Sequence, residues 1–193
     1  MPAINLYFPT PIYIEYDLFN EEQNINWTTR LLELQKTVSS GGESWEGNTY
    51  TTHGKFDLLD DILFRPLIEK IQSHVNEFTK AHNSDFLHTC NSAWGNINTI
   101  NTFQEYHSHP GSVFSCVYYP KVPVGSGSIV FENPLAPDMM PVKNVTVFND
   151  LTQERIDYRP KEGMLLIFRS YLRHCVQSGT NADPRVSISL NFG

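Results

Sequence analysis

Charged side chains are scarce in this sequence, and the basic ones are the scarcer sign. Only 18% of the 193 residues are charged, with 14 Lys and Arg against 21 Asp and Glu and a net charge of −7. A typical soluble domain is about 25% charged. Proteins that bind nucleic acid in general need a basic surface. The composition therefore argues against nucleic acid as a partner.

Long apolar runs and paired cysteines are also absent. No run approaches the ~20 residues of a membrane span, and the first sixteen residues show no basic segment followed by an apolar one. We expect no membrane partner and a cytoplasmic location. Cys90, Cys116 and Cys175 form no CxxC pair, so free thiols in a reducing compartment are predicted.

Two helical patterns occupy the first part of the chain. Asn20 can cap a helix that ends at the glycine-containing cluster 39–42. A second helix is predicted to start near Pro66, because proline suits a first helical turn, and to end before 83–85.

From about residue 90 the pattern changes to short β-strands. We expect a single α+β domain over 1–193, with a helical part (1–90) packing on an all-β core (91–193) of sandwich, jelly-roll or small-barrel type. The predicted strands are 93–100, 101–108, 113–119, 127–132, 143–148, 154–158, 164–168, 173–177 and 185–192.

Two of the seven histidines stand close together, His107 and His109, just before a turn at Pro110. Residues i and i+2 of a strand share a face, so both imidazoles could reach one point, and Glu105 has the same parity. Imidazole suits iron, zinc, copper and nickel. A metal site is one interpretation of this pair, and two structural histidines are the other; the pair alone does not decide between them. The other histidines outside the C-terminal part are interpreted as surface or structural residues: His53, His74, His82 and His88.

The predicted strand 185–192 alternates polar and apolar side chains. Its polar face carries Arg185, Ser187, Ser189 and Asn191. Polar groups along a core-like strand suggest a polar cavity. The other interpretation is the exposed face of an edge strand, and the alternation leaves both open.

The order of these segments resembles the 2-oxoglutarate- and Fe(II)-dependent oxygenases, in particular a small bacterial and phage family of them. The resemblance rests on the opening 6–13, the segment 107–112, the strands 115–119 and 127–131 with Asn133-Pro134, the strand 165–168 after Pro160 and Gly163, His174, and 185–187. It implies a double-stranded β-helix (a jelly-roll, cupin-like core) buttressed by the N-terminal helices. It also implies a bacterial or phage-infected cell as the setting.

Carried onto this sequence, the resemblance implies the parts of a site. His107 and His174 match iron ligands, Arg185 and Ser187 match contacts to the distal carboxylate of 2-oxoglutarate, and Tyr119 matches a further donor to it. The implied activity is that of a dioxygenase. It would hydroxylate a C–H bond of a small-molecule or peptidyl substrate with dioxygen, releasing succinate and CO₂.

One residue departs from the pattern of the resemblance. His109 stands where the usual two-histidine, one-carboxylate triad has Asp or Glu. His109 could itself be a ligand, which we favour, or Glu105, Glu132 or water could fill the position. The departure keeps two alternatives open: a three-histidine cupin-like iron enzyme that does not use 2-oxoglutarate, and a non-catalytic jelly-roll binding module. The sequence does not indicate an oligomeric state.

Overall fold

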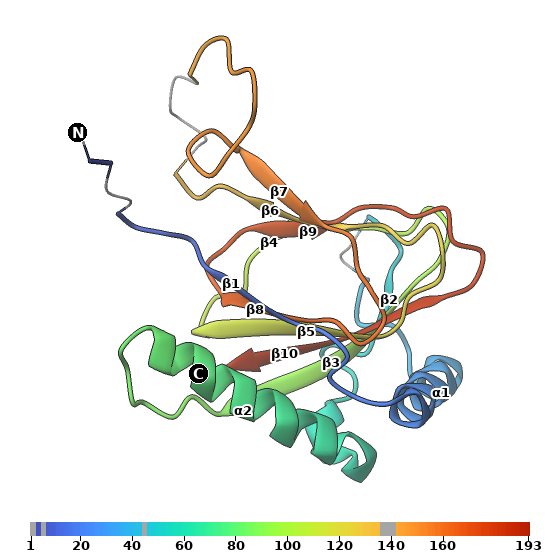
Figure 1. Ribbon diagram of the computed structural model, residues 1–193. Helices are drawn as coiled ribbons and strands as arrows, with labels where there is room; N and C mark the ends of the chain where they lie inside the picture. The colour runs from blue at the N-terminus through green and yellow to red at the C-terminus, as the bar shows by residue number, and fades with distance from the viewer. Residues whose placement is uncertain (1–2, 5–6, 44–45, 136–141) are drawn as a thin grey trace.

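The computed structural model describes residues 3–4, 7–43, 46–135 and 142–193 and shows three layers (Figure 1). The helices are α1 (Glu21–Thr37) and α2 (Arg65–Ala81), with the 3₁₀ turns η1 (Leu58–Asp60) and η2 (Ile62–Phe64). The strands are β1 (Ile12–Glu15), β2 (Tyr50–Thr51), β3 (Cys90–Asn98), β4 (Gln104–His107), β5 (Phe114–Lys121), β6 (Ile129–Glu132), β7 (Arg155–Tyr158), β8 (Leu165–Arg169), β9 (His174–Val176) and β10 (Arg185–Phe192). Among the described helices, none has the length and apolar character needed to cross a membrane.

Both predicted helices form with the expected ends. The Asn20 side chain accepts a hydrogen bond from the Gln23 amide, and the Gln23 side chain accepts one from the Asn20 amide. This reciprocal capping satisfies two backbone donors that the first turn leaves open. Pro66 lies in the first turn of α2, where its missing N–H is no loss.

The ten strands form two antiparallel sheets that face each other without closing into a barrel. The larger has the order β1-β8-β5-β10-β3-β2, and the smaller has the order β4-β9-β6-β7. In Figure 1 the helices lie on one side of the larger sheet and the smaller sheet lies on the other. This arrangement confirms the predicted double-stranded β-helix with buttressing helices.

Two apolar cores hold the layers together. The first lies between the helices and the larger sheet, and it includes Leu31 of α1, Ile71 of α2 and Ile188 of β10, all 0% exposed. The second lies between the two sheets. Its buried members are Val117, Tyr119, Ile129, Phe131, Met164, Leu166, Phe168 and Leu172. The larger sheet is therefore covered on both faces.

Strand β10 runs through the interior of the larger sheet, hydrogen-bonded to β3 on one side and β5 on the other. The interpretation of 185–192 as an edge strand is therefore wrong. Its apolar residues belong to the helix-facing core, and its polar residues point toward the smaller sheet. This second face contributes to the site.

The prediction of a strand at 143–148 is wrong. The described segment runs through turns and bends, Asn144 has a positive φ of 56°, and Val147 and Phe148 are exposed. Apolar residues alone suggested a strand, but a strand also needs a neighbour to pair with. The short strands β1 and β2 were not predicted, and β1 completes the edge of the larger sheet beside β8.

Candidate active site

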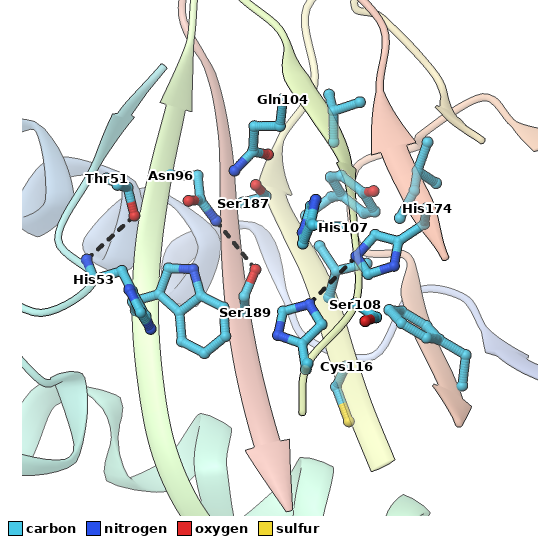
Figure 2. A pocket seen from close by; sticks show the side chains of 17 residues that line it. Thr51, His53, Asn96, Gln104, His107, Ser108, Cys116, His174, Ser187 and Ser189 are labelled. Atoms are coloured by element: carbon cyan, nitrogen blue, oxygen red, sulfur yellow. Dashed lines mark hydrogen bonds between the residues drawn. The ribbon is translucent and has the colours of Figure 1, made fainter. Parts of the chain in front are cut away.

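Three histidines from three different segments converge between the two sheets (Figure 2). His107 ends β4, His109 lies in the turn that follows, and His174 begins β9. One ring nitrogen from each of the three histidines lies within 4.8 Å of the other two. The Nε2 atoms of His109 and His174 are 3.3 Å apart. The structure therefore brings together the three side chains that the sequence analysis named as candidate ligands.

Backbone carbonyls fix the orientation of two of the imidazoles. His107 Nδ1 lies 2.7 Å from the Glu105 carbonyl oxygen, and His174 Nδ1 lies 2.9 Å from that of Leu172. A carbonyl only accepts, so each Nδ1 carries the proton. In a neutral imidazole the other nitrogen, Nε2, then has a lone pair available to a metal.

All three imidazoles are biased toward the neutral form. Burial lowers the pKa of His107 and places the pKa of His174 well below its usual value. Burial, with smaller effects of the neighbouring His107 and His53, lowers the pKa of His109 to about 4. Neutral imidazole is the form that binds metal ions. The group is therefore ready for a metal at neutral pH without first releasing protons.

Neither candidate carboxylate joins this group among the described residues. Strand β4 has a bulge where it pairs with β9. Gln104 is opposite Val176 and His107 is opposite His174, so β4 has one more residue than β9 between the two pairs. The bulge breaks the parity that aligned Glu105 with His107, and Glu105 Oε1 accepts a hydrogen bond from the Glu46 amide instead. Glu132 Oε2 lies 3.3 Å from Arg173 Nε. His109, and neither carboxylate, is the third member of the group among the described residues.

The histidines open on a cavity of about 180 Å³ between the sheets. Ser187 and Tyr119, predicted to contact a cosubstrate, line it. The remaining lining residues are Thr51, His53, Trp94, Asn96, Gln104, Ser108, Cys116, Val117, Ile129, Phe168, Val176 and Ser189. No Asp, Glu, Lys or Arg is among the described lining residues, so the walls mix polar and apolar side chains without a charged one.

Arg185 lies behind this lining, 1% exposed. Its Nη1 donates to the Gly127 carbonyl at 3.0 Å, and its Nη2 donates to Asn98 Oδ1. Its Nε has no hydrogen-bond partner, and no described carboxylate forms an ion pair with it. A buried guanidinium without an anion is costly, and a ligand carboxylate fits its planar donors.

Tyr119 connects Arg185 to the cavity. Its ring lies 5.7 Å from the centre of the Arg185 guanidinium, and it is 1% exposed. Burial raises the pKa of Tyr119 to about 12, against an opposing effect of Arg185. The phenol therefore keeps its proton at neutral pH and can donate a hydrogen bond.

The wall that β3 contributes to the cavity was not predicted from the sequence. Trp94 and Asn96 line the cavity, and Asn98 binds Arg185. Trp94 packs 5.6 Å from the His109 ring, and His53, interpreted as a surface or structural residue, packs edge-on against Trp94 at 4.8 Å. The alternation of Trp94, Asn96 and Asn98 along one strand is a period-two signal that could have revealed this face.

A family model described as "Putative 2OG-Fe(II) oxygenase" matches residues 92–191. The matched range includes all three histidines and Arg185. A search of curated proteins by sequence gives no match.

Solved structures with the same fold are numerous but distant in sequence. A prolyl-4-hydroxylase from Pseudomonas putida is 12% identical, with 95% of this chain and 92% of that chain covered and a TM-score of 0.63. A Trichoplax adhaerens prolyl hydroxylase, solved with a hypoxia-inducible-factor peptide, is 13% identical, with coverages of 94% and 82% and a TM-score of 0.64. HygX from Streptomyces hygroscopicus, solved with nickel and 2-oxoglutarate, is 11% identical, with coverages of 95% and 83% and a TM-score of 0.67.

Proposed function

The chain belongs to this family of 2OG-Fe(II) oxygenases, whose model matches just over half of it, and we propose that its three histidines and its buried arginine hold the iron and the cosubstrate. The family makes the protein an Fe(II)- and 2-oxoglutarate-dependent dioxygenase. The observation that carries the residue assignment is the convergence of three neutral imidazoles on one side of the cavity, with the unpaired guanidinium of Arg185 behind the lining.

The donor set fits a divalent first-row metal. His107, His109 and His174 would bind it through ring nitrogens, and the carbonyls of Glu105 and Leu172 hold two of these rings in place. Bound iron and 2-oxoglutarate supply the activation of dioxygen for the oxidation of a substrate C–H bond, with release of succinate and CO₂. The chain's own contribution is to orient the ligands and to exclude water.

Three residues are proposed to bind the cosubstrate. Arg185 offers its guanidinium to the carboxylate that points away from the metal, as the fork geometry of arginine favours. Ser187 and the neutral Tyr119 would add hydroxyl donors to the same ligand. Because Asn98 and Gly127 already hold two of its nitrogens, Arg185 is fixed before the ligand arrives.

The substrate is proposed to be a neutral small molecule or a peptidyl group. The uncharged cavity walls support this proposal, as do the fold relatives, which include a hydroxylase solved with a peptide. We also propose a cytoplasmic location, because the three cysteines are free and none forms a disulfide.

The test is an anaerobic titration of the metal-free protein with Fe(II) and then 2-oxoglutarate, followed by visible absorption. Chelation of Fe(II) by the keto acid produces a metal-to-ligand charge-transfer band, and we expect it to saturate near one equivalent. Iron binding without the band would favour the three-histidine enzyme that does not use 2-oxoglutarate. Absence of iron binding would favour the binding module.

Two variants assign the ligands in the same titration. His174→Ala is expected to abolish iron binding while leaving the fold intact, as judged by circular dichroism. His109→Asp restores the usual triad and is expected to retain or tighten iron. Unchanged iron stoichiometry in the first variant would remove His174 from the site. Complete loss of metal in the second would mean that His109 has another role.

A further inference from the structure

Asn96 presents an unused hydrogen-bond acceptor inside the cavity. The residue lies in the middle of β3, is 2% exposed and lines the cavity wall. Its Nδ2 donates to Ser189 Oγ at 3.1 Å, as the dashed line in Figure 2 marks, while its Oδ1 is buried with no hydrogen-bond partner among the residues that the structure describes. A buried acceptor with no donor costs about 1–3 kcal/mol, so such atoms are uncommon unless a ligand or water completes them.

The neighbours of Asn96 place it in the interior of the larger sheet. Ser189 stands on β10, next to β3 in the interior of the larger sheet. Along the same pair of strands, Asn96 is opposite Ser187, and Trp94 is opposite Ser189. The free oxygen is therefore set on rigid strands between the proposed cosubstrate contact and the aromatic wall beside His109.

The cosubstrate does not complete this oxygen. At neutral pH 2-oxoglutarate carries two carboxylates and a keto group, all of which only accept hydrogen bonds. An amide oxygen facing such groups is repelled. The missing partner must therefore carry an N–H or O–H group, and that leaves the substrate or a water molecule.

The surroundings of Asn96 specify the charge of this partner. Trp94, Thr51 and Gln104 line the same cavity with it, and no charged side chain does so among the described residues. A buried cation or anion placed here would find no counter-charge on the described walls of the cavity. A neutral donor is compatible with these walls, and an aromatic wall accommodates an apolar or planar group that carries it.

We propose that Asn96 is a substrate-binding residue that selects a neutral hydrogen-bond donor, an amide N–H or a hydroxyl, on the group entering beside Trp94. This inference rests on the proposed function, because it takes the cavity as a substrate site. A site built to bond a donor rejects the analogue that lacks it, since the buried acceptor is then left unpaired.

Three small probes of nearly equal shape test the proposal: acetamide with an N–H donor, 2-propanol with an O–H donor, and acetone with none. Each is titrated into ¹⁵N-labelled protein loaded with Zn(II), which does not turn over, with and without 2-oxoglutarate. The indole N–H signal of Trp94 reports binding. Acetamide or 2-propanol is expected to bind at least tenfold more tightly than acetone, and the tighter of the two identifies the donor class.

Asn96→Ala is expected to remove this preference. Gln104→Ala, which alters another lining residue, is the matched control and should retain it. Equal binding of all three probes to the wild-type protein would overturn the proposal. It would mean that the partner of Asn96 Oδ1 is a water molecule. An unchanged preference in Asn96→Ala would overturn the proposal too.

The wild-type comparison needs no variant, so it decides the question even if Asn96→Ala does not fold. Failure of the proposed function would be seen separately, as loss of the charge-transfer band in the iron titration. The zinc-loaded protein reports on Asn96 in either case.

Discussion

The two faces of β10 differ in almost every respect although they belong to one strand. Toward the helices it presents Val186, Ile188, Leu190 and Phe192, all 0% exposed in a continuous apolar core. Toward the smaller sheet it presents Arg185, Ser187, Ser189 and Asn191. Successive strand residues point to opposite faces, so eight residues serve two environments.

This difference separates stability from function along a single strand. The helix-facing side chains gain free energy from leaving water. The cavity-facing side chains give up hydration, and Arg185 does so without an anionic partner in the protein. Substitutions on the first face should therefore change the free energy of unfolding, and substitutions on the second should change ligand binding.

The largest expected effect is on the apolar face. Ile188→Ala removes a side chain that is 0% exposed, and we expect a loss of about 2–5 kcal/mol in the free energy of unfolding. Urea unfolding measures it. The folded fraction should bind 2-oxoglutarate with nearly wild-type affinity. A large loss of affinity in the folded protein would show that the two faces are not independent.

Arg185→Ala is the matching change on the other face. We expect the affinity for 2-oxoglutarate to fall by about 100-fold, roughly 2.7 kcal/mol, because the carboxylate anchor is lost. Iron affinity should change little, since Arg185 is not among the three histidines grouped for a metal. Isothermal titration of the metal-loaded proteins checks this. Equal 2-oxoglutarate affinities for variant and wild type would remove Arg185 from the site.

The smallest effect is a pH dependence of the metal-free protein. The pKa of His109 is about 4 in the folded state, below the usual 6.5, so the unfolded chain takes up the proton first as the pH falls. The stability present above pH 6.5 is therefore lost toward pH 4. Between pH 6.5 and 5.5 His109 should account for a loss of about 1 kcal/mol.

His109→Gln isolates this contribution. Chemical unfolding of both metal-free proteins in a chelating buffer, at pH 6.5 and 5.5, gives the two differences to compare. The variant should lose less stability than the wild type over this interval. Equal losses would mean that the pKa of His109 is not lowered in the folded protein.

The sequence predicts well those features that depend on neighbouring residues. The Asn20 cap and the early proline of α2 set the helix starts within one residue. The alternation in 185–192 correctly divided the polar from the apolar side chains. Each of these signals is local in the chain, so no knowledge of the fold was needed.

Features that depend on distant pairing were missed. The alternation in 185–192 did not decide whether these residues line a cavity or form an exposed edge strand. That depends on whether other strands pair with β10 on both sides, as β3 and β5 do. Segment 143–148 has the composition of a strand but no partner strand. The β4 bulge, visible only against β9, removes Glu105 from the histidine group.

The proposed binding of a metal by the three histidines would also link the stability of the chain to the metal supply of its cell. His109 and His174 are 65 residues apart, so their nitrogens come together only after the two sheets have assembled. A metal ion that binds this arrangement therefore binds the folded chain and favours it by mass action. Scarcity of iron would then reduce the amount of folded protein as well as its activity, because unfolded chains are the ones that proteases remove.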